Sequence, residues 1–332
     1  MERRDFLRIA LGGAAAAAVA PAAMAQSAMA QASYPDRPIR LIVPFPPGGV
    51  NDAVARPWVE FVKTSLGSVV IENQGGAGGA VGAAAAARAN PDGYTLLFGS
   101  GATHVVVPTA SPKPPYDPER DFEPIAIISV SGIGVAVHPS HPAKTLKELI
   151  DDARARPGKL SYASAGVGSA THLGAELFKS LTKTDIQHVP YRGGGPALND
   201  LVGGHVPVGF INVTGQVLEL QRAGKIRLLA VTTPKRAVGA PDLPTAEEAG
   251  VPGCVALNYA GIFAPAKTPR AIVDRVAKAT QEAMANPDFV RLLTASGFEP
   301  SADNNPDAAR RFVRAELDRW VPVIKEIGLK LE

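Results

Sequence analysis

The sequence has one cysteine, few aromatic residues and little net charge. With Cys254 as the only cysteine, no intramolecular disulfide can form, which excludes the disulfide-rich scaffolds of small secreted domains. The formal charge is +3, and Arg and Lys are dispersed among Asp and Glu, so there is no basic stripe of the kind that binds nucleic acid. The 332 residues suggest about two globular domains.

Motifs typical of enzymes are also missing. No Ser or Thr follows either Gly-Lys pair, as a P-loop requires, and no G-x-S-x-G motif is present. His138 and His141 form an H-x-x-H pair, but a proline follows each, which predicts a loop and a poor metal site. We therefore predict no catalytic residue, no metal and no cofactor. A secreted hydrolase that uses Ser169 and His172 is kept as an alternative.

The first thirty residues have the composition of an export signal. A basic head with the sequence R-R-D-F-L-R at 3–8 precedes an uncharged run rich in Ala and Gly. Two A-x-A patterns, ending at Ala25 and Ala30, fit signal peptidase. We predict a twin-arginine-like signal peptide over 1–30, cleavage near Ala25 or Ala30, and a periplasmic mature protein. An ordinary secretory signal or a retained anchor are the alternatives.

From residue 38 onward, short apolar runs alternate with longer helical patterns, which predicts an α/β fold with parallel sheets covered by helices. The Pro-rich stretch 99–124 predicts a long irregular connection at a domain boundary. The expected strands are 39–45, 69–72, 94–98, 125–129, 134–137, 160–163, 186–189, 208–211, 227–231 and 256–263. The expected helices are 51–66, 80–89, 146–156, 170–181, 196–202, 216–222, 269–285, 287–296 and 306–327.

Glycine-rich loops follow three of the expected strands, and an expected helix follows each loop. They are P-P-G-G-V-N-D at 46–52, S-A-G-V-G-S-A-T-H at 164–172 and P-Y-R-G-G-G at 190–195. Small residues at a helix start let free backbone N–H groups face open space, where they attract anions. Each loop alone fits a tight turn, but three of them in a chain without catalytic motifs predict an anion-binding cleft.

Motifs along the chain resemble those of one protein family. They are V-P-F-P-P-G-G at 43–49, S-Y-A-S-A-G-V-G-S-A-T-H-L at 161–173, V-P-Y-R-G-G-G-P-A-L at 189–198 and F-A-P-A at 263–266. In order and spacing, residues 34–330 resemble the substrate-binding receptors of tripartite tricarboxylate transporters, the Bug-type periplasmic solute-binding proteins. The resemblance implies a two-lobed Venus-flytrap clamshell in which each lobe is a mainly parallel sheet flanked by helices. It places 32–126 and 256–332 in lobe one, and 127–255 in lobe two.

The resemblance also implies that loops of both lobes hold a ligand carboxylate through backbone amides, hydroxyl groups and water. Asp52 is expected to cap a helix, His172 either to orient its loop or to pack as a helix residue, and Arg192 to lie at the cleft mouth or on the surface. The implied ligand-binding residues are Phe45, Gly48, Gly49, Asp52, Ser100 and Thr103 in lobe one, and Ala165, Gly166, Gly168, Ser169, Thr171, His172, Tyr191, Arg192 and Asn212 in lobe two.

The function implied by the resemblance is an extracytoplasmic receptor for a small carboxylate, either a di- or tricarboxylate or an aromatic acid. The receptor would be a monomer without a nucleic-acid partner, and would deliver its ligand to the membrane permease subunits of a tripartite tricarboxylate-type transporter. Asn212 stands where many members carry Asp, which favours a ligand without an ammonium group. A sensor that presents the bound state to a signalling partner is the alternative.

Overall fold

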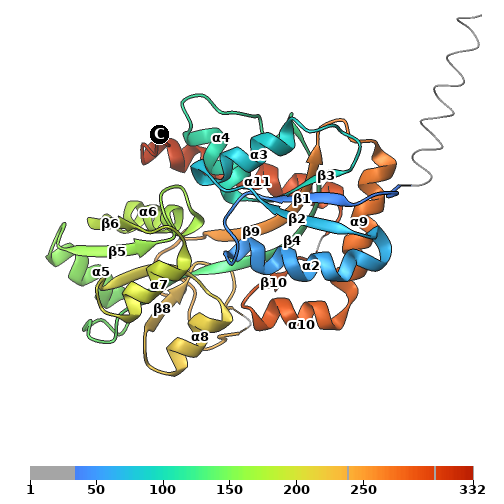
Figure 1. The fold of residues 1–332 in the computed structure, drawn as a ribbon. Helices are drawn as coiled ribbons and strands as arrows, with labels where there is room; N and C mark the ends of the chain where they lie inside the picture. Colours follow the sequence, from blue (N-terminus) through green and yellow to red (C-terminus); the bar gives the residue numbers. More distant parts are fainter. Residues whose placement is uncertain (1–33, 238, 303, 332) are drawn as a thin grey trace, which may run out of the picture.

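The protein is an α/β structure built on one curled sheet, with helices packed around it (Figure 1). The computed structural model describes residues 34–237, 239–302 and 304–331, so the predicted export signal lies outside the described residues. The strand order is β2-β1-β3-β9-β4-β7-β5-β6, and β8 and β10 also pair with β4. The strands are β1 (Ile39–Val43), β2 (Val69–Asn73), β3 (Thr95–Ser100), β4 (Phe122–Val137), β5 (Leu160–Ser164), β6 (Ile186–Pro190), β7 (Val208–Asn212), β8 (Arg227–Val231), β9 (Leu257–Pro265) and β10 (Glu299–Pro300).

The helices begin where the sequence supplies caps. Five helices start at a residue whose side chain accepts a hydrogen bond from a backbone N–H of the first turn: Thr145, Ser169, Thr214, Asn286 and Asn305. The helices are α2 (Val50–Leu66), α3 (Ala80–Ala87), α4 (Val107–Ala110), α5 (Leu146–Ala155), α6 (Ala170–Thr182), α7 (Gly194–Val202), α8 (Gly215–Arg222), α9 (Arg270–Ala285), α10 (Pro287–Ala295) and α11 (Pro306–Glu326), with short helical turns η1 (Ala77–Gly79) and η2 (Ala102–Val106).

The α/β fold is confirmed, but the strand pairing is mixed rather than mainly parallel. β1 pairs in parallel with β2 and β3, and β5 pairs in parallel with β6 and β7. β9 runs antiparallel to β3 and β4, and β4 runs antiparallel to β7, β8 and β10. The reason is that the chain crosses the molecule along β4 and returns along β9, so these two strands point in opposite directions.

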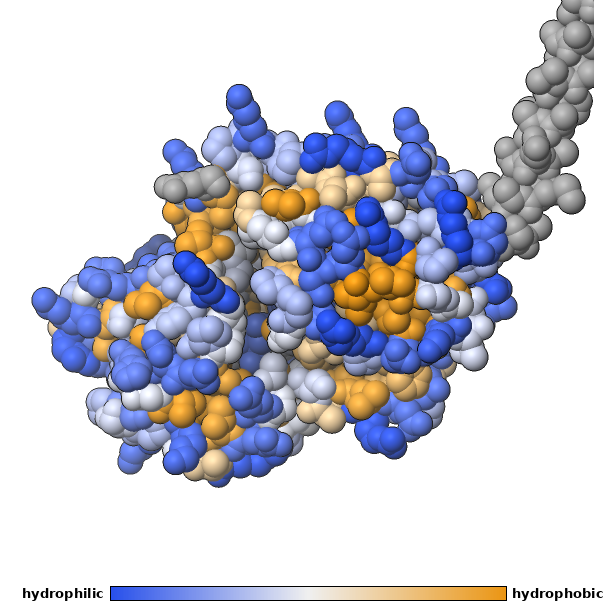
Figure 2. All heavy atoms as spheres, viewed as in Figure 1, coloured by the Kyte–Doolittle hydropathy of each residue, from blue (hydrophilic) through white to orange (hydrophobic). Residues whose placement is uncertain are grey.

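β4 is one strand of 16 residues, where the sequence predicted two. The backbone continues without a break between 129 and 134, pairing with β9 up to Gly132 and with β7 from Ile133. β4 therefore divides the sheet. We call β1, β2, β3, β9, β10 and the start of β4 the first half, and β5, β6, β7, β8 and the end of β4 the second half. A hollow separates the two halves on the face shown in Figure 2.

The stretch 99–124 is more ordered than the sequence predicted. It contains η2 and α4, and only the part after Ala110 is irregular. Pro108 does not prevent the helix, because it lies in the first turn of α4, where the missing N–H costs no hydrogen bond. His104 is fully buried in η2 and stacks on Phe263 of β9, with ring centroids 3.7 Å apart.

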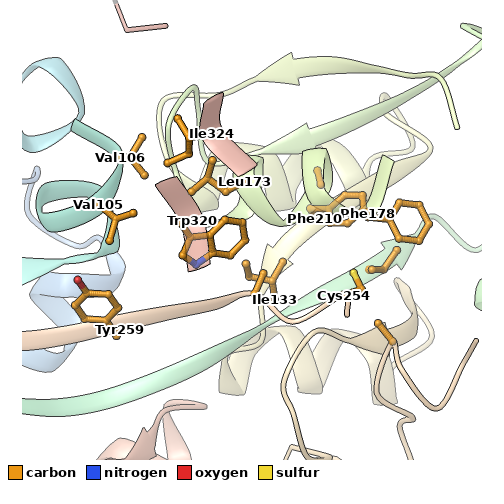
Figure 3. Close-up of a cluster of buried hydrophobic side chains, with 14 of the residues drawn as sticks. Val105, Val106, Ile133, Leu173, Phe178, Phe210, Cys254, Tyr259, Trp320 and Ile324 are labelled. Carbon is orange, nitrogen blue, oxygen red and sulfur yellow. The ribbon is translucent and has the colours of Figure 1, made fainter. Parts of the chain in front are cut away.

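One hydrophobic core extends through both halves. Trp320 and Ile324 of α11 pack with Leu173 of α6, Ile133 of β4 and Tyr259 of β9 (Figure 3). A separate cluster lies under α2 and α9 in the first half. The C-terminal helix therefore contacts both halves through this shared core. Among the described helices, none is both long and apolar enough to cross a bilayer.

A second contact between the halves has no room for a side chain. Gly215 begins α8, and a Cβ atom there would lie 2.2 Å from the carbonyl oxygen of Ala295 at the end of α10. Gly215→Ala should therefore lower the free energy of unfolding by about 1–3 kcal/mol, because backbone must move to admit the methyl group. Urea unfolding at constant pH measures this loss.

Gly195→Ala is the matched control, since Gly195 also lies in the first turn of a helix, but a Cβ atom there would have no other atom within 4 Å. We expect that variant to be as stable as the wild type or more stable by up to about 1 kcal/mol. Equal stabilities for the two variants would contradict the proposed contact.

Candidate functional site

A cavity of about 320 Å³ lies between the two halves, where the three glycine-rich loops meet. The loops leave the ends of β1, β5 and β6, and the ends of β3, β7 and β9 complete the wall. This is the crevice beyond the carboxyl ends of parallel strands in which α/β proteins bind ligands. The lining residues are Phe45, Pro46, Pro47, Gly48, Gly49, Val50, Asn51, Ser100, Ala102, Ala165, Ser169, Ala170, Thr171, Arg192, Gly193, Gly194, Gly195, Pro196, Asn212 and Asn258.

The cavity brings together most of the site residues that the sequence predicted. The predicted residues that line it are Phe45, Gly48, Gly49, Ser100, Ala165, Ser169, Thr171, Arg192 and Asn212. The predicted residues that do not line it are Asp52, Thr103, Gly166, Gly168, His172 and Tyr191. Among the lining residues that the prediction omitted, Asn51 lies in the first turn of α2 and Asn258 lies on β9, far along the chain from every glycine-rich loop.

Asp52 holds the first loop and does not face the cavity. Its carboxylate accepts hydrogen bonds from Gly48 N (2.9 Å), Arg56 Nε (2.7 Å) and Asn73 Nδ2 (3.2 Å). Burial raises the pKa of this carboxyl, but the hydrogen bonds outweigh burial and leave the pKa below its usual value. The N-cap residue of α2 is Gly49 rather than the predicted Asp52. Asp52 lies in the first turn of α2 and connects that turn to the first loop.

Ser169 organises the second loop. Its hydroxyl donates to the carbonyl oxygen of Gly166 (2.7 Å), accepts from His172 N (3.2 Å), and lies 2.9 Å from Thr171 Oγ1. Thr171 Oγ1 in turn accepts from Ala165 N (2.9 Å). Both hydroxyl groups are therefore fixed at the start of α6, on the cavity wall.

His172 both packs inside the molecule and orients the second loop. It is buried, its Nδ1 accepts a hydrogen bond from Gly168 N (3.2 Å), and its ring stacks on His188 with centroids 4.1 Å apart. His188 in turn lies 2.7 Å from Ser164 Oγ through its Nε2. The hydrolase alternative needs the imidazole of His172 to bond to Ser169 Oγ, but the Ser169 hydroxyl instead donates to a backbone carbonyl.

The third loop supplies the positive charge. Arg192 is the only charged side chain among the lining residues, and no carboxylate of the described residues forms an ion pair with it. Gly193 begins α7 without a side-chain cap, so the first N–H groups of α7 have no side-chain partner at this end. Tyr191 points away from the cavity, because its hydroxyl donates to Asp200 Oδ2 on α7 (2.6 Å).

Two amide side chains of the cavity, the buried Asn51 and the half-buried Asn212, each have one buried atom without a partner among the described residues. Within the described residues, Asn51 Nδ2 and Asn212 Oδ1 have no hydrogen-bond partner, and Asn51 is 5% exposed. A buried polar atom without a partner costs about 1–3 kcal/mol, which a ligand or a bound water can recover. The described residues contain no group of three or more potential metal ligands. The arrangement therefore suits a small anion held by N–H, hydroxyl and guanidinium groups.

Comparisons with known proteins agree with this architecture. The family model for the tripartite tricarboxylate transporter family receptor matches residues 54–329. Protein BugT of Bordetella pertussis is 37% identical over 302 residues, which cover 90% of this chain and 92% of BugT. The structure of the periplasmic binding protein BugD is similar, with a TM-score of 0.80, 34% identity, and coverage of 90% of this chain and 99% of BugD.

Two similar structures contain ligands. An R. palustris protein solved with adipate has a TM-score of 0.82 and 35% identity, and the match covers 90% of this chain and 99% of that one. MatC from Rhodopseudomonas palustris, solved with bound malate, has a TM-score of 0.80 and 33% identity, and the match covers 88% of this chain and 100% of MatC. The two-lobed fold of periplasmic binding proteins is thereby confirmed.

The stacked histidines behind the second loop should make stability depend on pH. Burial, together with a smaller contribution from the nearby His172, lowers the pKa of His188 to about 4. A histidine in an unfolded chain has a pKa near 6.5. Below that pH, His188 is protonated in the unfolded chain but stays neutral in the folded protein. The free energy of unfolding should therefore fall from pH 6.5 towards pH 4, by up to about 1.4 kcal/mol per pH unit for this group.

Urea unfolding of the wild type and of His188→Gln at pH 7, 6 and 5 measures this effect. The variant should lose less stability over that interval, because its side chain does not titrate. Parallel pH profiles for the two proteins would contradict the assignment.

Proposed function

The chain belongs to the tripartite tricarboxylate transporter receptor family, and from this we propose that it binds one small carboxylate between its two halves and delivers it to a permease of that transporter type. Receptors of this type are periplasmic binding proteins. In our proposal the chain is exported through a cleavable signal over 1–30, acts as a monomer, and has no chemistry of its own. The observation that carries this proposal is the cavity in which the three glycine-rich loops converge with Arg192 and with two amide atoms, Asn51 Nδ2 and Asn212 Oδ1, none of which has an ion-pair or hydrogen-bond partner within the described residues.

A carboxylate fits this cavity better than a cation or a neutral solute. The first turns of α2, α6 and α7 all point at it with their positive ends, Arg192 adds a formal charge, and no acidic side chain lines it. The relatives solved with adipate and malate support the same ligand class. Phe45, Ala102 and Pro196 supply apolar surface for the carbon skeleton.

The proposed ligand-binding residues come from both sides of the cleft. We propose that 32–126 and 256–332 form lobe one, that 127–255 form lobe two, and that the ligand closes one lobe onto the other. Gly48 and Gly49 stand on lobe one in this division, and Ser169, Thr171 and Arg192 stand on lobe two. Only a closed arrangement lets both sets contact one carboxylate, so the ligand favours that arrangement by its differential affinity.

Closure is measurable in solution. Saturating adipate should lower the radius of gyration by small-angle X-ray scattering, because the lobes move together. Sodium chloride at the same ionic strength is the control and should leave the radius unchanged. A carboxylate that binds by calorimetry without any change in the radius would contradict closure.

Ser169→Ala tests the contribution of the second loop. We expect the Ser169 hydroxyl to turn from the carbonyl oxygen of Gly166 to the carboxylate when the ligand enters. Removing the hydroxyl should then weaken carboxylate binding by about tenfold, because a charge-assisted hydrogen bond contributes about 1.5–3 kcal/mol and water replaces part of it. Calorimetric titration of adipate, malate and aromatic acids into both proteins gives the affinities, after a thermal-shift screen selects the tightest probe.

Thr145→Ala is the matched control for the loss of a helix cap. Thr145 caps α5 through a 3.2 Å hydrogen bond from Glu148 N, as Ser169 caps α6, but it lies outside the cavity. The control should lose stability and keep its affinity. Equal affinities in the wild type and Ser169→Ala would remove Ser169 from the site.

A further inference from the structure

A second cavity adjoins the proposed carboxylate site. It has a volume of about 460 Å³ and is lined by residues of α7 and α8 on one side and of α2 and the end of α10 on the other. The residues that line both cavities are Gly48, Gly49, Val50, Gly194, Gly195 and Asn212. Because the same six residues border both, the two cavities meet at this wall.

Gly194 and Gly195 have no packing reason to be glycine. Both lie in the first turn of α7, neither has a positive φ, and a Cβ atom at either position would have no other atom within 4 Å. Alanine there would stabilise the helix by about 1 kcal/mol per position, so the pair costs stability without relieving a clash. What the two glycines provide is open space between the cavities.

The walls of the second cavity are almost free of charge. Ala53 of α2, Leu198 of α7, Val217 of α8 and Phe298 are its apolar residues, and Thr214, Gln216 and Ser296 add uncharged polar groups. The one charged side chain of its wall is Glu219, which is exposed on α8, and no Lys, Arg or His borders it. A second carboxylate at this end of a ligand would therefore lie near a negative charge, with no cation to pair with it.

We propose that the ligand is an elongated monocarboxylate, whose head occupies the first cavity and whose uncharged tail passes Gly194 and Gly195 into the second. This inference rests on the proposed function, because it assigns the head to the carboxylate site. Asn212, on the shared wall, has a buried Oδ1 without a partner among the described residues. It would accept a hydrogen bond from a hydroxyl or amide group where head and tail join.

Calorimetric titration with two series of acids tests the proposal on the wild type. Straight-chain monocarboxylates from butanoate to decanoate should bind more tightly with each added carbon, by about fourfold per buried methylene, until the second cavity is full. Dicarboxylates from succinate to sebacate should bind more weakly than the monocarboxylate of the same length, and the difference in affinity should grow with chain length. Equal affinity for the two series at the longer lengths would overturn the assignment of an uncharged tail.

Ala53→Phe tests whether the second cavity holds the tail. Ala53 lines the second cavity and not the first, so a phenyl ring there should reduce the affinity ratio of octanoate to butanoate by at least tenfold. Gly195→Val should lower the same ratio, because the valine side chain would narrow the passage between the two cavities. The control is Asn199→Phe, which places the same ring on an exposed position of α7 outside both cavities and should leave the ratio unchanged.

The outcomes separate this inference from the function on which it rests. Binding that does not depend on chain length, or a ratio that Ala53→Phe leaves unchanged, overturns the tail site and leaves the carboxylate receptor in place. Failure of every mono- and dicarboxylate to bind the folded wild type overturns both.

Discussion

The structure depends on two strands that run in opposite directions through the middle of the molecule. β4 carries the chain from the first half to the second, and β9 pairs with its first part on the way back. The strands next to this pair run antiparallel to it: β3 beside β9, and β7 beside β4. Further out, β1 and β2 continue the sheet in parallel from β3, and β5 and β6 continue it in parallel from β7. Because the halves also share the core around Trp320 and Tyr259, they are not independent domains joined by a flexible linker. Any relative movement must bend the two strands while that core persists.

The same framework explains how the proposed anion site could work with one cation. β1, β5 and β6 end at the cleft, so α2, α6 and α7, which follow them, present their positive ends to the cavity. Asp52, an acid in the first turn of α2, is already engaged by Arg56, Asn73 and Gly48 N. Its negative charge holds the loop in place rather than repelling a ligand. Fixed dipoles supply the remaining attraction, and they need no reorganisation when the ligand enters.

Most of the fold could be predicted from the sequence, because periodicity and caps act locally. The strand after Pro38 is visible in a few neighbouring residues, and the glycine-rich loops mark the cleft in the same way. Pairing is not local: nothing near residue 257 indicates that β9 inserts between β3 and β4. For the same reason Asn258 escaped prediction as a lining residue, since only that insertion brings it to the cavity. For His172 the sequence motif predicted the position of the loop correctly. It did not predict that the imidazole ring is buried and turned away from the cavity.

The position of β9 also has a consequence for how the protein is made. β3 and β4 follow one another along the chain, yet in the sheet they are held apart by a strand synthesised more than a hundred residues later. While the chain emerges from the ribosome, that slot stays empty, and α11, which covers the shared core, arrives last of all. Native folding of the first half must therefore wait for nearly the whole polypeptide, which makes it a post-translational event with slow, long-range closure. A truncated chain would leave two unpaired strand edges open to association with other molecules.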